Sequence, residues 1–245
     1  MAKPRLVSAD EERRMTVIEH LEELRRVLII SFIALAVGAV IGFLLSGYVL
    51  ELILHPIRAV IGNEKLYVTA PVDKFLLYFK IGFFTGFILA SPVILWQVWT
   101  FVAPGLHRNE RRFAVGFVAS AVLLFLMGMG FAYFAMPIAL RFLIGFGTNE
   151  IQYLALVNSY LNFVMLLIII FGITFELPLA MTMLGLAGIV SRQFLTRNRF
   201  KFWLGIFAGS NIVTPGADPV TPMLLCIPLI ILFEIGILVI GALRR

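Results

Sequence analysis

Charged side chains are scarce in this sequence. Only 14% of its 245 residues are Asp, Glu, Lys or Arg, whereas 61% are hydrophobic. Such a composition leaves too few polar groups to cover the surface of a water-soluble domain. The sequence contains a single cysteine, Cys226. One cysteine excludes an internal disulfide and a cysteine-rich metal site. The composition therefore predicts an integral membrane protein.

Motifs for enzymatic chemistry are also missing. The sequence contains no Gly-x-x-x-x-Gly-Lys-Ser/Thr phosphate loop and no His-Glu-x-x-His pair, and its histidines, His20, His55 and His107, are scattered. No nucleophile is paired with a credible base. The net charge of +6 reflects membrane topology and attraction to anionic headgroups rather than nucleic acid binding. We therefore expect no enzymatic activity, no metal, no cofactor and no nucleic acid partner.

Long apolar runs dominate what is present. Residues 27–50, 81–106 and 113–140 contain no Asp, Glu, Lys or Arg, and each run exceeds the roughly 20 residues that a membrane-spanning helix requires. The pattern predicts an all-α, polytopic membrane protein with six transmembrane helices in one domain, residues 27–243. The predicted spans lie at about 27–48, 72–99, 113–136, 161–187, 200–214 and 222–242.

The fifth predicted span is the shortest. Its apolar stretch of about 12 to 16 residues falls below normal hydrocarbon thickness, so a buried or re-entrant segment is an alternative. We favour a crossing, because it returns the chain to the side on which Arg244 and Arg245 belong. The connection at 214–219 contains proline and glycine and suits a hairpin between two short helices.

The distribution of arginine and lysine predicts the orientation. Cationic residues are concentrated before the first span and after the second and fourth spans, which marks these faces as cytoplasmic. Both termini, including residues 244–245, are therefore expected inside. The residues that carry this prediction are Lys3, Arg5, Arg13, Arg14, Arg25, Arg26, Arg108, Arg111, Arg112, Arg192, Arg197, Arg199 and Lys201.

The cytoplasmic leader, residues 1–26, ends in a periodic pattern. Val17, Leu21, Leu24 and Leu28 recur at three- and four-residue spacing, which is typical of an amphipathic helix. We expect this helix to lie in the cytoplasmic interface and then to bend into the first span. A helix that is simply stabilised by internal ion pairs is the alternative.

Glu110 is the lone carboxylate of a basic loop, residues 101–112. A basic loop at a membrane face normally only fixes orientation. An acid inside such a loop leaves a negative site that can receive a cationic partner through charge-assisted hydrogen bonds.

Two further acids lie inside predicted spans. Glu176 falls near mid-span, where a charged carboxylate costs about 3 kcal/mol or more. It is either a neutral acid that bonds to Thr174 or Thr182, or a participant in transport. Glu234 lies nearer the cytoplasmic end, where we expect it to reach the interface or to pair with Arg244.

Several longer motifs resemble one protein family. Residues 20–26, 91–112, 175–178 and 232–236 closely resemble TatC, the six-span receptor subunit of the twin-arginine protein translocase. The similarity covers nearly the whole chain. It implies a receptor that binds the twin-arginine signal peptides of folded precursor proteins and supports export driven by the proton-motive force. It also implies a curved helix bundle in the bacterial plasma membrane, several copies per complex, and TatA and TatB as partners near the fifth and sixth spans.

The resemblance assigns roles to individual residues. Acids that match Glu23 and Glu110 recognise the paired arginines, while Arg25, Phe101 and Pro104 match positions that shape the same surface. The chemistry agrees, because guanidinium groups bind carboxylates through bidentate hydrogen bonds that lysine matches less well. Two arginines therefore require two acids on one membrane face.

The resemblance also implies that Glu176 lines an intramembrane pocket. The match weakens at 214–222, where relatives have a shorter turn and a glutamine at the position of Pro222, so a polar contact from the sixth span to Glu176 is not implied. Structural or partner-docking roles are predicted for Pro56, Asp218 and Glu234.

A second hypothesis belongs to another class of protein. A proton-coupled secondary transporter of a small solute would use Glu176 as its proton site, and would show inverted repeats with interrupted helices at mid-membrane. The sequence has no clear internal repeat. The receptor hypothesis is therefore preferred.

Overall fold

The computed structural model describes residues 17–62, 65–102, 114–147, 153–214 and 218–243. Within these residues the chain is almost entirely helical, and the β-bridge that it contains pairs Tyr67 with Leu156. The predicted all-α class is therefore confirmed for the described part of the chain. The helices are α1 (Val17–Leu44), α2 (Ser46–Ile61), α3 (Pro71–Val102), α4 (Ala114–Gly145), α5 (Val157–Thr174), α6 (Leu177–Leu186), α7 (Arg192–Arg197), α8 (Arg199–Val213) and α9 (Val220–Leu243).

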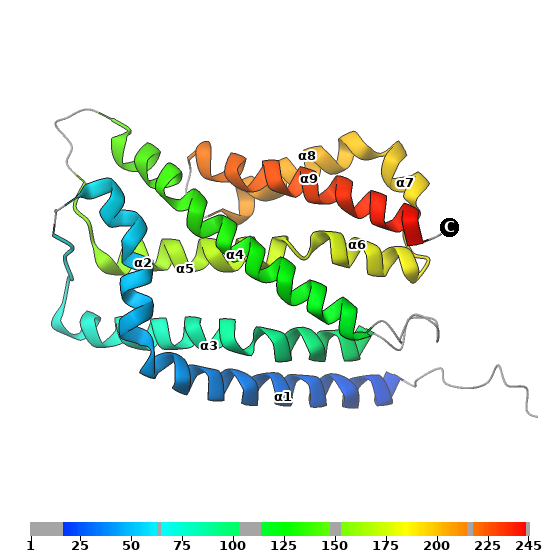
Figure 1. The fold of residues 1–245 in the computed structure, drawn as a ribbon, viewed down its shortest axis with the longest axis horizontal. Coiled ribbons are helices and arrows are strands. Elements are labelled where there is room, and N and C mark those ends of the chain that lie inside the picture. The colour runs from blue at the N-terminus through cyan, green and yellow to red at the C-terminus, as the bar shows by residue number, and fades with distance from the viewer. Residues whose placement is uncertain (1–16, 63–64, 103–113, 148–152, 215–217, 244–245) are drawn as a thin grey trace, which may run out of the picture.

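The long helices lie side by side and alternate in direction (Figure 1). α1 and α3 run antiparallel along one edge of the bundle, the α5–α6 pair follows, and α8 and α9 form the opposite edge. α4 crosses the bundle diagonally, and α2 crosses it near the end of α1. One end of the bundle therefore gathers the start of α1, the end of α3, the start of α4, the short α7 and the end of α9.

Among the described residues, five segments are long and apolar enough to cross a membrane, namely α1, α3, α4, the α5–α6 pair and α9. α8 has 15 residues and is shorter than the roughly 20 residues of an ordinary span. Five of the predicted spans are therefore present as helices of sufficient length. A crossing by α8 stays a prediction.

The start of α1 differs from the prediction. Val17–Leu44 is one uninterrupted helix, so the bend that we expected between the leader helix and the first span is wrong. The physical reason lies in the sequence, because neither proline nor glycine occurs between residues 17 and 37 to interrupt the helical hydrogen bonds. The interfacial position of the leader stays a prediction.

Glycines allow α1 and α3 to touch through their backbones. A Cβ atom on Gly38 would lie 2.6 Å from the carbonyl oxygen of Gly86, and a Cβ on Gly42 would collide with the carbonyl oxygen of Gly82. Membrane helices associate through such close packing of small residues, because lipid tails are as apolar as the side chains. The contact brings the second half of α1 against the first half of α3.

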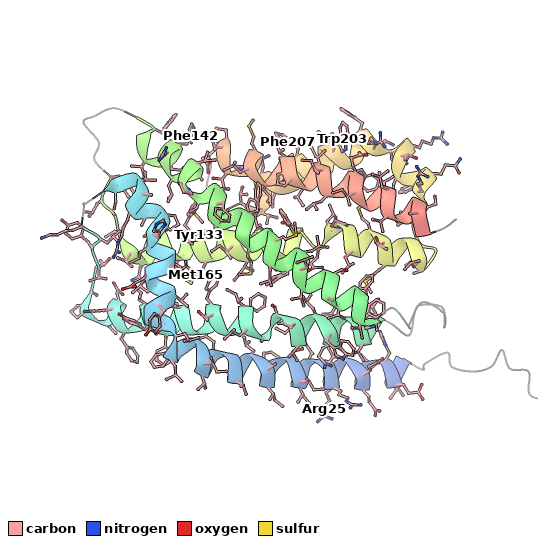
Figure 2. All side chains as sticks on the ribbon, in the orientation of Figure 1. Arg25, Tyr133, Phe142, Met165, Trp203 and Phe207 are labelled. Carbon is pink, nitrogen blue, oxygen red and sulfur yellow. The ribbon has the colours of Figure 1, made fainter. Side chains whose placement is uncertain are left out.

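The connection that follows α1 is helical, which the sequence prediction missed. Pro56 lies inside α2, and its missing N–H leaves the carbonyl oxygen of Leu52 without the usual helical donor. The Tyr133 hydroxyl of α4 donates to that oxygen at 3.1 Å. The Tyr160 hydroxyl of α5 donates to the neighbouring oxygen of Ile53 at 2.6 Å. These bonds attach α2 to α4 and α5, and Figure 2 shows Tyr133 where α4 passes α2.

Candidate functional site

His20 on α1 contacts both Glu23 on the same helix and Phe101 on the last turn of α3, and we call these three residues the α1–α3 acid cluster. The His20 ring stacks on the Phe101 ring, with centroids 4.3 Å apart and planes inclined by 17°. The Nδ1 atom of His20 lies 3.9 Å from Oε2 of Glu23. Two of the predicted recognition residues, Glu23 and Phe101, therefore lie in one cluster.

The Glu23 carboxylate is largely buried. Its side chain is 19% exposed, and its Oε2 atom is buried without a hydrogen-bond partner among the described residues. The contact with His20 is an ion pair only when the imidazole is protonated. A carboxylate removed from water gains stability from any cationic donor that reaches it. Glu23 therefore keeps capacity to bind a guanidinium group.

Arg25 does not join this cluster. It is exposed, and Figure 2 shows its side chain at the outer edge of the bundle, away from α3. Two residues along an α-helix turn by about 200°, so Glu23 and Arg25 project from opposite faces. Pro104 and Glu110 lie outside the described residues. The structure thus connects Glu23 with Phe101 through His20 and places Arg25 on another face of α1.

His20 is a member of the cluster that the sequence prediction missed, since it appeared there only as part of a motif. The sequence spacing predicts that His20 and Glu23 lie close together, because His20 stands three positions before Glu23 and residues three apart on a helix share a face. The contact with Phe101 could not be predicted in this way, because it depends on how α1 and α3 are aligned.

Glu176 lies at the break between α5 and α6, directly before Leu177 and Pro178. It lines a cavity of about 150 Å³, which we call the Glu176 cavity. The Oε1 atom of Glu176 is buried and has no hydrogen-bond partner in the described part of the chain. The other lining residues are apolar and come from α3, α4 and α6: Leu95, Val98, Trp99, Phe117, Val118, Ala121, Leu179, Ala180 and Met183.

Of the two alternatives for Glu176, the hydrogen bond to Thr174 or Thr182 is not formed. The Thr174 hydroxyl donates to the oxygen of Ile170 at 2.8 Å, and the Thr182 hydroxyl donates to the oxygen of Pro178 at 2.7 Å. Both threonines bond to the preceding turn of their own segment, as threonines inside helices commonly do. The Glu176 carboxylate faces the cavity instead.

Glu234 has the partners that Glu176 lacks. Its Oε1 atom lies 3.0 Å from Nε of Arg199 and accepts a hydrogen bond from Nε1 of Trp203 at 3.2 Å. Both partners belong to α8, whereas Glu234 belongs to α9. The partner that we predicted, Arg244, lies outside the described residues. Glu234 therefore connects α9 with the shorter α8.

Asp218 precedes α9 and caps it. Its Oδ1 atom accepts hydrogen bonds from the backbone N–H groups of Val220 at 3.0 Å and Thr221 at 2.7 Å. The first N–H groups of a helix have no partner within the helix, and an aspartate in this position supplies one. The observed contact of Asp218 is thus with its own chain.

Fold and sites together define a multi-pass membrane protein that carries a largely buried acid, Glu23, at one end of its bundle and an unpaired acid, Glu176, in a cavity within the bundle. The model for the family "Sec-independent protein translocase protein (TatC)" matches residues 19–228. The chain belongs to the TatC family, whose members are components of a protein translocase.

Individual relatives agree with this assignment. The TatC protein of Carboxydothermus hydrogenoformans is 39% identical over 230 residues, which cover 94% of each chain. That of Aquifex aeolicus is 39% identical over 227 residues, covering 91% of this chain and 93% of the relative. A crystal structure of the twin-arginine translocase receptor TatC has a TM-score of 0.79 at 38% identity, and the match covers 93% of this chain and 100% of that chain. The resemblance stated from the motifs is confirmed, and a solute transporter is not favoured.

Proposed function

We propose that this protein is the receptor subunit of a twin-arginine translocase, and that Glu23 and Glu110 bind the paired arginines of signal peptides on folded cargo. The observation that carries the proposal is the Glu23 carboxylate, which is largely buried and has an oxygen without a hydrogen-bond partner among the described residues. The receptor named in the solved relative supports the same role.

The surroundings of Glu23 suit a guanidinium ligand. Arginine binds carboxylates in a planar, bidentate manner and also stacks on aromatic faces. The α1–α3 acid cluster offers both, because His20 lies beside the Glu23 carboxylate and its ring stacks on the ring of Phe101. α3 ends at Val102, so the segment that contains Glu110 leaves α3 from this same end of the bundle.

The proposed topology has six spans with both termini in the cytoplasm of a bacterial cell. Two observations support it. The described cationic residues of the leader and of 192–201 lie at one end of the bundle (Figure 1), as cytoplasmic loops require. α8 also runs opposite to α9, which suits a short hairpin of two crossing helices.

Partners of the TatA and TatB type would complete the translocase, and several copies of this protein would assemble in one receptor complex that supports export driven by the proton-motive force. The Glu176 cavity supports a docking role for this acid, because an unpaired carboxyl group in apolar surroundings gains from a polar side chain supplied by a neighbouring membrane helix. Pro56, Asp218 and Glu234 would keep the helices in position for such partners.

The recognition role is tested by photocrosslinking from a probe placed next to the paired arginines of a signal peptide. Glu23→Gln or Glu110→Gln should reduce crosslinking to the full-length protein in membranes by about tenfold or more, because each change removes a charge-assisted hydrogen bond.

The matched control is Glu22→Gln, because Glu22 is an exposed acid on the same helix. This variant should crosslink like the parent protein. Equal membrane levels of all variants separate binding from folding. Undiminished crosslinking of both Glu23→Gln and Glu110→Gln would overturn the proposal.

A further inference from the structure

The connection from α6 to α8 forms a cationic corner of the bundle, residues 189–201, which we call the α7 corner. Arg192, Arg197 and Lys201 are exposed there, and Figure 2 shows nitrogen-tipped side chains gathered around α7. The nearby acid, Glu234, is already paired with Arg199. In the described ranges no carboxylate pairs with Arg192, Arg197 or Lys201. No acid in the described part of the chain therefore neutralises these three charges.

Arg192 is held in place against α9. A Cβ atom on Gly241 would lie 2.7 Å from Nη1 of Arg192 and 2.9 Å from its Cζ. The guanidinium group therefore packs directly on the bare backbone of this glycine. A fixed, planar guanidinium presents its N–H donors in the geometry that phosphate oxygens accept.

Large apolar side chains flank the same cations. Ile189, Phe194 and Phe200 are 72%, 52% and 75% exposed. The corner lies at the end of helices that are long enough to cross a membrane. Aromatic rings beside cations are typical of elements that sit in the bilayer interface, with the rings at the acyl boundary and the cations among the headgroups.

We propose that the α7 corner is a binding site for the phosphodiester headgroup of an anionic phospholipid, held by Arg192, Arg197 and Lys201. Basic pockets beside membrane helices bind such headgroups through the same chemistry. An acidic protein would match the cations alone, whereas an anionic lipid matches the cations and the apolar side chains together. The occupant is therefore a lipid of the surrounding membrane.

The test counts lipids that stay bound to the purified full-length protein in mild detergent, by native mass spectrometry with phosphatidylglycerol or phosphatidylcholine added. The parent protein should retain phosphatidylglycerol in preference. In the triple variant Arg192→Gln, Arg197→Gln, Lys201→Gln the affinity for phosphatidylglycerol should fall by about tenfold or more. Each cation near an anionic headgroup changes the affinity by about fivefold.

A matched control removes the same charge from the opposite end of the bundle. Arg58, Lys65 and Lys74 are exposed there, and their replacement by glutamine should leave phosphatidylglycerol binding unchanged. An equal loss in this control would show a general charge effect and overturn the proposed site.

A second variant keeps every charge. Gly241→Val places a side chain where the Arg192 guanidinium lies, so it should weaken phosphatidylglycerol binding several-fold. If the triple variant does not fold, Gly241→Val and the single variant Lys201→Gln replace it in the same binding measurement. Equal binding of both lipids to the parent protein, unchanged binding in these variants, or preference for an acidic peptide over lipid would each overturn the inference.

Discussion

The two sides of α3 pack in opposite ways. Toward α1, Gly82 and Gly86 allow backbone contact and leave no space for a side chain. Toward α4 and α6, residues such as Trp99 border the Glu176 cavity of about 150 Å³. The first contact holds together α1 and α3, the helices that carry Glu23 and Phe101, whereas the second leaves room. One side of α3 thus builds a fixed site at the end of the bundle, and the other keeps space within it.

The two acids inside predicted spans show the same contrast. Glu234 is bonded to Arg199 and Trp203, while Glu176 has an oxygen without a partner in the described ranges. An acid whose bonds are satisfied within the fold stabilises it, and an acid without them costs free energy that a partner can recover. The difference separates a structural acid from a candidate docking acid.

The largest expected effect is at the α1–α3 contact. Gly86→Leu should lower the free energy of unfolding by about 3 kcal/mol or more, because the helices would have to separate. Thermal unfolding in detergent measures this loss. Gly130→Leu is the matched control, since a Cβ at Gly130 meets nothing within 4 Å, and it should cause little change. Equal stability of both variants would show that the close contact is unimportant.

A smaller loss is expected at Glu234. Glu234→Ala should lower the free energy of unfolding by about 1–2 kcal/mol, because Arg199 and Trp203 lose their common acceptor and remain only partly exposed to water. Glu234→Gln should cost less, since its amide oxygen still accepts from Trp203. The same unfolding measurement ranks the two variants. A fully stable Glu234→Ala protein would contradict the structural role.

The smallest effect on stability is expected at Glu176. Glu176→Leu should leave the free energy of unfolding unchanged, or raise it by up to about 1 kcal/mol, because an apolar side chain replaces an unpaired acid in an apolar cavity. Export of a twin-arginine precursor should nevertheless fall. A stability loss as large as that of Glu234→Ala would remove the distinction between the two acids.

The membrane class, five of the spans and the family could be predicted from the sequence, because the hydrocarbon layer demands long apolar helices. α2 was missed because its 16 residues fall short of a span and contain Pro56, which usually interrupts a helix. The glycine contact was missed although Gly38-x-x-x-Gly42 and Gly82-x-x-x-Gly86 have the spacing of a helix-packing motif.

The surroundings of the acids were harder to predict. Thr174 and Thr182 are close to Glu176 in sequence, but their hydroxyls bond within their own segments. Arg199 is far from Glu234 in sequence and reaches it only because α8 packs on α9. Which polar groups meet inside a bundle depends on helix alignment, which neither periodicity nor composition reveals.

The central claim is that Glu23 and Glu110 together bind the paired arginines of a signal peptide. A double-mutant cycle in lipid nanodiscs tests it most directly. The dissociation constant is measured for the signal peptide and for two versions of it in which one arginine is replaced by lysine. Each peptide is tested against the parent protein, Glu23→Gln and Glu110→Gln. Each acid should be coupled to one arginine by about 1.5 kcal/mol or more. Additive effects, with no coupling between either acid and either arginine, would contradict it.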